Sequence, residues 1–114
     1  MSDAYISVEK LHVLHSTQPV TIIDVRSDDE YRTGHIPGAI HLPADALSSR
    51  LDTIPSDRPV IAYCSMRHRG SSRSERVVTL LRESGYDAKA LEGGIPAWES
   101  ATYPVERSAN PSER

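Results

Sequence analysis

The chain has 114 residues, of which 38% are hydrophobic and 25% are charged, and its formal net charge at pH 7 is −3. This length fits one domain with a single modest core, and the negative balance argues against a general nucleic-acid binder. No apolar run approaches the roughly 20 residues of a membrane helix, and the opening MSDAYIS has neither the basic region nor the apolar stretch of a secretory signal, so no membrane association is expected.

The first half of the chain alternates helical and strand patterns. Ser7 can cap a short helix, and its apolar positions are Val8, Leu11 and Leu14. The β-branched run VTIIDV predicts a strand that is buried on both faces. In chain order we expect a helix from residue 8, a strand at 20–25, one helical turn capped by Ser27 or Asp28, and a short strand at 39–42.

The second half continues the alternation. A helix from about Ser72 to Ser84 has Val77, Val78 and Leu81 on one face, with Gly85 as its stop. The other expected elements are a helix at 45–51, a strand at 59–64, a strand at 87–91, and a helix at 95–100 with Trp98 facing inward. The last residues are polar, so we expect a domain of residues 1–103 and a tail of residues 104–114.

Strands that alternate with helices predict an α/β fold with a mostly parallel sheet. Ligands of such sheets bind beyond the carboxyl ends of the strands. Asp24 and Cys64 stand at the ends of two predicted strands. Both residues are therefore expected at the functional edge of the sheet.

Cys64 is the single cysteine, so it cannot form an internal disulfide, and a reducing cytoplasm is expected. It opens the stretch CSMRHRGSSRSER, in which a Gly- and Ser-rich loop leads into a helix. Backbone N–H groups of such a loop can form an anion nest, and the helix dipole adds positive potential. Together with Arg67, His68, Arg69 and Arg73 they favour the thiolate, so we expect a Cys64 pKa below the free value of about 8.5. A buried inert cysteine under a solvated basic loop is the alternative.

Two further stretches carry a family resemblance. IIDVRSDDEYRTGHIPGAIHLP, residues 22–43, and LEGGIPAWE, residues 91–99, resemble the two signatures of rhodanese domains, with YC…RS…LL…GY between them. The resemblance implies a three-layer fold, with a sheet of about five mostly parallel strands flanked by helices. It also implies that Cys64 accepts a sulfane sulfur as a persulfide and passes it to a nucleophile.

By the same resemblance, the donor is a small sulfur anion such as thiosulfate or a persulfide, the acceptor is a thiol, cyanide or a protein, and no cofactor is involved. The expected substrate-binding residues follow the cysteine: Ser65, Met66, Arg67, His68, Arg69, Gly70 and Arg73.

The sequence leaves open which arginine closes the loop. Cys64 to Arg69 is a six-residue loop of the kind usual in family sulfurtransferases, and Arg69-Gly70 follows the pattern that closes the seven-residue loop of phosphatase and arsenate reductase relatives. Counting back from Gly85 instead selects Arg73, which gives a ten-residue loop. Gly-Ser-Ser suits a nest and a cap better than a helix interior, so we expect a wide loop and a helix that starts between Ser71 and Ser74.

Three other signature residues are expected to shape the site. Asp24 is interpreted as holding loop N–H groups, and Arg26 as pairing with a carboxylate such as Glu30, although both can also act electrostatically. His35 is interpreted as fixing the Gly-His-Ile-Pro-Gly turn by hydrogen bonds. His12 and His15 have metal-compatible spacing but no third ligand near in sequence, so no metal is expected.

Three functions compete at this point. The first is a single-domain sulfurtransferase that works through a Cys64 persulfide. The second is a rhodanese-like phosphatase or arsenate reductase that uses the same cysteine. The third is a non-catalytic interaction module or a sulfur carrier for one protein partner.

Overall fold

The computed structural model describes residues 4–65 and 73–107. Within these residues five strands form one sheet in the order β1-β5-β4-β2-β3, and every neighbouring pair is parallel. The strands are β1 (Tyr5–Ile6), β2 (Thr21–Asp24), β3 (Ile40–His41), β4 (Val60–Tyr63) and β5 (Ala88–Leu91). The expected α/β class, with a small parallel sheet of about five strands, is confirmed.

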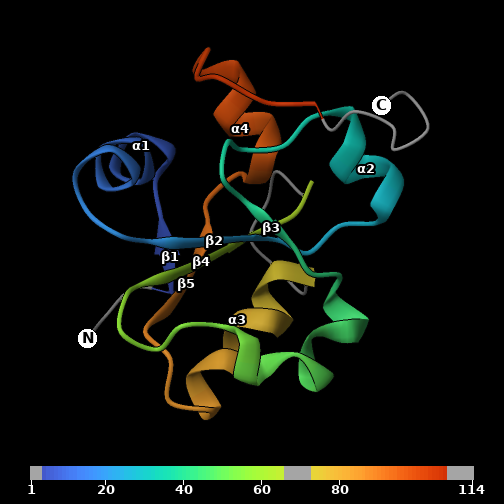
Figure 1. Cartoon of the computed structure of the whole chain (residues 1–114). Coiled ribbons are helices and arrows are strands. Elements are labelled where there is room, and N and C mark those ends of the chain that lie inside the picture. Colours follow the sequence, from blue (N-terminus) through green and yellow to red (C-terminus); the bar gives the residue numbers. More distant parts are fainter. Residues whose placement is uncertain (1–3, 66–72, 108–114) are drawn as a thin grey trace.

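Helices cover both faces of this sheet (Figure 1). Figure 1 shows α1 (Val8–Thr17), α2 (Asp28–Thr33) and α4 (Gly94–Ser100) on one side. On the other side lie α3 (Arg73–Glu83) and two short 3-10 helices, η1 (Ala44–Ser49) and η2 (Leu51–Thr53). The result is the three-layer arrangement that the sequence predicts.

Two elements differ from the sequence-based expectation. The first described element is a two-residue strand, β1, which pairs with β5 and is too short to show an alternating pattern. The α-helix expected at residues 45–51 is wrong, because this segment forms η1 and η2. Leu47 is the buried residue of η1. Short helical segments often adopt the tighter 3-10 geometry.

Alternation along the strands divides the core into two clusters. Ile22, Ile61 and Tyr63 pack with α1 and α4, including the fully buried Trp98. Ile23 and Ala62 pack with α3, and so does Cys64. Successive side chains of a strand point to opposite faces. Tyr63 packs on the α1 and α4 side, so the next residue, Cys64, lies on the α3 side of the sheet.

The direction in which the chain winds reverses between β2 and β4. These strands are neighbours, with Asp24 opposite Tyr63. From β2 the chain passes through α2 to the edge strand β3, whereas from β4 it passes through α3 to β5 on the other side. Such a reversal of direction is the usual place of a ligand site in a parallel sheet.

Residues beyond Tyr103 contact the domain. The Trp98 indole N–H donates to the Pro104 carbonyl at 2.7 Å. His35 and Glu106 form an antiparallel bridge, and Arg107 donates to the Thr33 carbonyl at 3.1 Å. The first four residues of the expected tail therefore lie against α2 and α4, and the domain boundary at Tyr103 stays a prediction.

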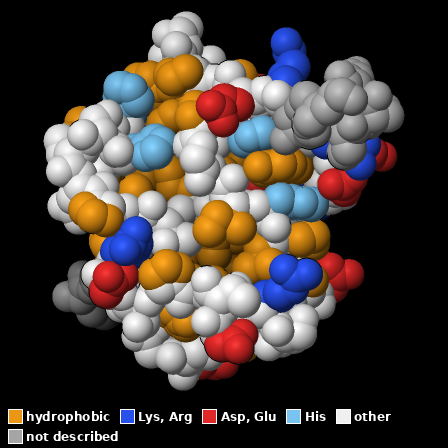
Figure 2. All heavy atoms as spheres, viewed as in Figure 1, with side chains coloured by type: hydrophobic (Ala, Val, Ile, Leu, Met, Phe, Trp, Pro, Cys, Tyr) orange, Lys and Arg blue, Asp and Glu red, His pale blue; other side chains and the backbone are white. Residues whose placement is uncertain are grey.

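The surface mixes charges of both signs. Figure 2 shows Lys, Arg, Asp and Glu side chains scattered over the face seen in Figure 1. Among the described residues, no helix has the length and apolar character that a membrane span requires.

The buried hydroxyl of Tyr63 gives a test of this core. Tyr63 is fully buried, and its oxygen accepts the N–H of Ile36 at 3.1 Å. Tyr63→Phe would leave this N–H without its acceptor, so we expect the free energy of unfolding to fall by about 1–3 kcal/mol. Tyr103→Phe is the matched control, because Tyr103 is only partly buried and stacks on His12. Equal urea-unfolding curves for the two variants would contradict the proposed role of the Tyr63 hydroxyl.

Candidate active site

Cys64 follows β4 and has fixed backbone surroundings. Its carbonyl accepts the N–H of Ile95, in the first turn of α4, at 3.0 Å. On the neighbouring strand, the N–H of Val25 donates to the Tyr63 carbonyl at 3.1 Å. The cysteine side chain is 1% exposed. The two family-like stretches around residues 24 and 94 therefore meet on either side of the cysteine.

The Cys64 sulfur contacts a buried hydroxyl. Its Sγ lies 3.4 Å from the Oγ of Ser74, in the first turn of α3. A thiolate has no proton, so in the thiolate state the serine hydroxyl must be the donor. This contact can stabilise negative charge on Cys64, because a hydrogen bond to the charged form favours that form.

Glu30 joins the two described ends of the cysteine loop. Its carboxylate accepts the Ser65 hydroxyl at 3.2 Å and the Arg73 guanidinium at 3.0 Å. Arg73 also donates to the Ser65 Oγ at 3.2 Å. We call Glu30, Ser65 and Arg73 the Glu30 cluster. It brings together the residue after Cys64 and the first residue of α3.

The sequence SDDE sets the position of Glu30 locally. Ser27 caps α2, and its Oγ accepts the Glu30 N–H, while the Glu30 side chain accepts the Ser27 N–H at 3.0 Å. This is a capping box. The hydrogen bond from Arg73, with further contributions from Ser27, lowers the pKa of Glu30 from 4.5 to about 2. The same pairing raises the pKa of Arg73.

Asp24 and Arg26 form a separate buried pair. Arg26 is 5% exposed, and its guanidinium donates to both oxygens of Asp24, at 2.6 Å for the shortest contact. Burial opposes its charge, but the hydrogen bonds and charge of Asp24 prevail, so the pKa of Arg26 is raised. The expected pairing of Arg26 with a carboxylate is confirmed, but the partner is Asp24 and not Glu30, which binds Arg73 instead. Asp24 also accepts the Arg26 N–H at 2.9 Å.

His35 lies at the opposite end of α2 from the Glu30 cluster. Its Nδ1 donates to the Tyr31 carbonyl at 2.9 Å, and its ring stacks on Tyr31. Its Nε2 is 3.7 Å from a carboxylate oxygen of Glu106. These contacts fit the interpretation that His35 fixes the turn after α2.

The structure brings Asp24, Arg26, Cys64, Ser65 and Arg73 to the carboxyl edge of the sheet. Met66, Arg67, His68, Arg69 and Gly70 lie outside the described residues, as do Ser71 and Ser72. Their substrate-binding roles, and the width of the loop, stay predictions. The first described residue of α3 is Arg73, which lies within the range predicted for the start of the helix.

Sequence reasoning missed two residues of this site. The sequence suggests Glu30 only as a partner of Arg26, and it gives Ser74 only as one limit of the range in which the helix begins. The capping-box spacing from Ser27 to Glu30 was readable in the sequence. Nothing local shows that Glu30 meets a residue 43 positions later.

The histidines at residues 12 and 15 do not converge on one point. His12 stacks on Tyr103, whereas His15 contacts the Pro37 carbonyl at 2.8 Å. Among the described residues there is no group of three or more His, Cys, Asp or Glu side chains that could hold a metal ion.

The pH dependence of stability tests the ion pair between Glu30 and Arg73. Its lowered pKa means that its contribution to stability is present above about pH 4.5 and is lost as the pH falls toward 2. Glu30→Gln should therefore be less stable than the wild type near neutral pH, and the difference should shrink between these two pH values. Thermal unfolding across this range measures it, with Glu83→Gln at the exposed end of α3 as the matched control. A difference that does not change with pH would contradict the ion pair.

Comparison with known proteins gives consistent matches. A family model described as Rhodanese-like domain matches residues 7–101. A sulfurtransferase of Allochromatium vinosum is 36% identical over 93 residues, which cover 81% of this chain and 83% of that protein. The crystal structure of a rhodanese-related protein from Thermoplasma volcanium has a TM-score of 0.82 at 25% identity, covering 93% of this chain and 100% of that chain.

A further relative has a different name and a greater length. An HTH-type transcriptional regulator of Mycobacterium tuberculosis is 39% identical over 90 residues, which cover 79% of this chain and 39% of the regulator. This chain thus spans well under two thirds of that protein. The family model covers residues 7–101 of this chain, which is most of its 114 residues, so the chain belongs to the rhodanese-like domain family.

Proposed function

We propose that the protein is a sulfurtransferase that carries a sulfane sulfur on Cys64, with thiosulfate or a persulfide as donor, and that it acts in the cytoplasm. The observation that carries this proposal is the position of Cys64. It lies at the carboxyl end of a central parallel strand, with its sulfur 3.4 Å from a buried hydroxyl. The sulfurtransferase name of the Allochromatium relative supports the same activity.

The first half-reaction forms a persulfide. The Cys64 thiolate attacks the outer sulfur of thiosulfate, a Cys64 S–S bond forms, and the bond between the two donor sulfurs breaks. Sulfite leaves with the electron pair of that bond. The Ser74 hydroxyl, at hydrogen-bond distance from Sγ, would donate to the anionic sulfur before the attack.

The second half-reaction returns the thiolate. A thiol, cyanide or a protein nucleophile attacks the outer sulfur of the persulfide, and the Cys64 sulfur leaves as thiolate. No net oxidation or reduction of the protein takes place over the cycle. The roles proposed for Arg67, His68 and Arg69 are to recruit the anionic donor at the rim, and Arg73 would position Ser65 beside the cysteine.

A second candidate is a sulfur carrier that serves one protein partner. The regulator relative favours it, because the portion that matches this chain is only part of a longer protein named for transcription. Both candidates predict loading of Cys64. They differ in the acceptor, since an enzyme should pass the sulfur rapidly to small nucleophiles such as cyanide, whereas a carrier should pass it rapidly only to its protein partner.

Loading of Cys64 is measured directly by mass. After incubation with thiosulfate and removal of the donor, the intact protein should gain the mass of one sulfur atom, and cyanide should remove it. Cys64→Ser should gain nothing and should keep its fold. Because the phosphatase alternative uses the same cysteine, hydrolysis of an aryl phosphate is measured in parallel. An unchanged mass, or phosphate release comparable to sulfur transfer, would contradict the proposal.

A further inference from the structure

The segment that follows α4 crosses to the far end of α2. Figure 1 shows this stretch, coloured red, running from α4 to the end of α2. We call residues 104–107 the C-terminal strap. The family model ends at residue 101, so the strap lies outside the part of the chain that this model matches. A role for the strap therefore does not follow from family membership.

Hydrogen bonds tie the strap to both helices. The buried indole of Trp98 donates to the first carbonyl of the strap at 2.7 Å. The N–H and carbonyl of Glu106 pair with the carbonyl and N–H of His35, each at 2.8 Å. Arg107 donates to the carbonyl of Thr33, the last residue of α2, at 3.1 Å. The strap thus joins α4 to the end of α2.

The helix α2 depends on contacts at its ends. It has six residues, and none of them is buried. Isolated helices shorter than about 12–15 residues are marginal in water, so α2 needs contacts with other parts of the chain. Its first turn is held by the capping box and by the contact of Glu30 with Arg73. Beyond its last turn, Gly34 accepts the Arg26 guanidinium at 2.6 Å, and the strap adds its hydrogen bonds there.

The helix α4 is held mainly by the core. Its residues Ile95 and Trp98 are both buried in one cluster, and Trp98 is 0% exposed. The N–H of Ile95 donates to the Cys64 carbonyl. Since burial of a large aromatic side chain stabilises a fold several times more than one hydrogen bond does, α4 should keep its place without the strap. Loosening of the strap should therefore act on the cysteine loop through α2.

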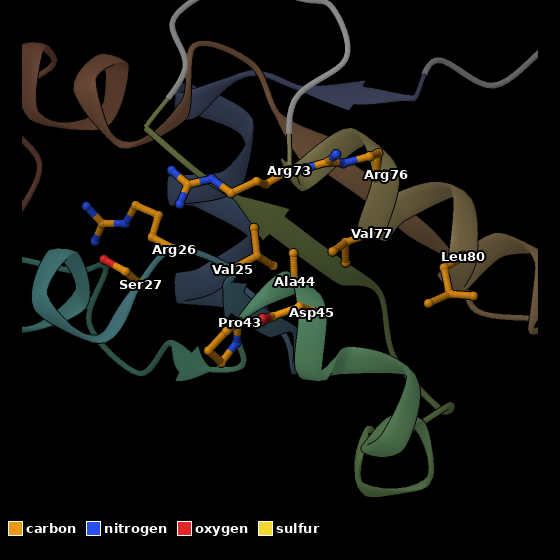
Figure 3. Close-up of a pocket in the computed structure, with 10 residues that line it drawn as sticks. All are labelled: Val25, Arg26, Ser27, Pro43, Ala44, Asp45, Arg73, Arg76, Val77 and Leu80. Atoms are coloured by element: carbon orange, nitrogen blue, oxygen red, sulfur yellow. The ribbon is translucent and has the colours of Figure 1, made fainter.

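The contact between Glu30 and Arg73 is sensitive to such a change. The Arg73 side chain is 33% exposed, and its ion pair with Glu30 is 3.0 Å long. It also lines a pocket of about 570 Å³ together with Val25 and Val77 (Figure 3). Open space borders Arg73 on that side, so core packing does not fix its position. A displacement of α2 would therefore release the Arg73 end of the cysteine loop.

We propose that the C-terminal strap is a positioning element of the site. It holds α2 so that Glu30 keeps Ser65 and Arg73 in place while Cys64 takes up sulfur. The inference rests on the proposed function, because sulfur loading is its readout. The strap acts through α2 and Glu30 and not by contact with the reacting sulfur. Detachment of the strap would then slow loading without blocking the site.

The variant Glu106→Pro tests the proposal in the full-length chain. Proline has no N–H, so this change removes the hydrogen bond to the His35 carbonyl. Single-turnover loading of Cys64 from thiosulfate should become about twofold to tenfold slower, which corresponds to the loss of one hydrogen bond. Val105→Pro is the matched control, because the Val105 N–H makes no backbone hydrogen bond with any residue that the structure describes. Loading at the wild-type rate in Glu106→Pro, or equal slowing in both variants, overturns the proposal.

A second background shows whether the effect runs through Glu30. In Glu30→Gln the contact with Arg73 is already weakened, so adding Glu106→Pro should slow loading by less than about 1.5-fold. A role of the strap in general stability, or an action through α4, would instead slow loading by the same factor in both backgrounds. Equal factors therefore overturn the proposal.

Hydrogen exchange gives a readout that does not depend on the chemistry of the cysteine. Amide exchange in α2 should become faster in Glu106→Pro but not in Val105→Pro, and exchange in α4 should stay unchanged. If Glu106→Pro fails to fold, Arg107→Ala replaces it, because this change removes only an exposed donor to the Thr33 carbonyl. Unchanged exchange in α2 overturns the proposal.

Failure of this inference is distinct from failure of the proposed function. If the wild type and Glu106→Pro load equally fast, sulfur transfer stands and the role of the strap is wrong. If the wild type takes up no sulfur, the proposed function itself is wrong and the inference falls with it.

Discussion

The geometry of the site depends on one carboxylate. Glu30 binds Ser65 and Arg73, so a helix on one face of the sheet fixes the two described ends of the cysteine loop, although α3 begins on the other face. Its own position follows from the capping box of α2. The other end of α2 is fixed by His35 and by its bridge to Glu106. Contacts therefore run from the C-terminal residues through α2 to the cysteine loop.

The two described arginines near Cys64 are each paired with a carboxylate. They therefore contribute oriented hydrogen-bond donors more than net positive charge. Arg26 has Asp24 as a buried partner, and Arg73 has Glu30. A buried ion pair is weak evidence for stability, since desolvation offsets much of the attraction, but its hydrogen bonds fix geometry. Negative charge on the sulfur would then be met by oriented donors such as the Ser74 hydroxyl.

Much of the fold was readable from the sequence, and the site only in part. The apolar runs around Ile23 and Ile61 identified the central strands, and they placed Asp24 and Cys64 at one edge. The two-residue β1 depends on pairing with β5 and has no local signal. Arg26 pairs with Asp24, two residues away, whereas Arg73 meets Glu30 only through the tertiary fold, so the second pair has no local signal. The pocket lined by Val25, Ala44 and Val77 combines three separate segments, so no single stretch could reveal it.

We infer that the Glu30–Arg73 contact positions the two described ends of the cysteine loop for sulfur transfer. A double-mutant cycle of Glu30→Gln and Arg73→Gln, read as the single-turnover rate of Cys64 loading from thiosulfate, tests it most directly. Each single change should slow loading, and the double variant should be no slower than the slower single variant, because both remove the same contact. Effects that multiply in the double variant would show that the two side chains act independently, which would contradict the account.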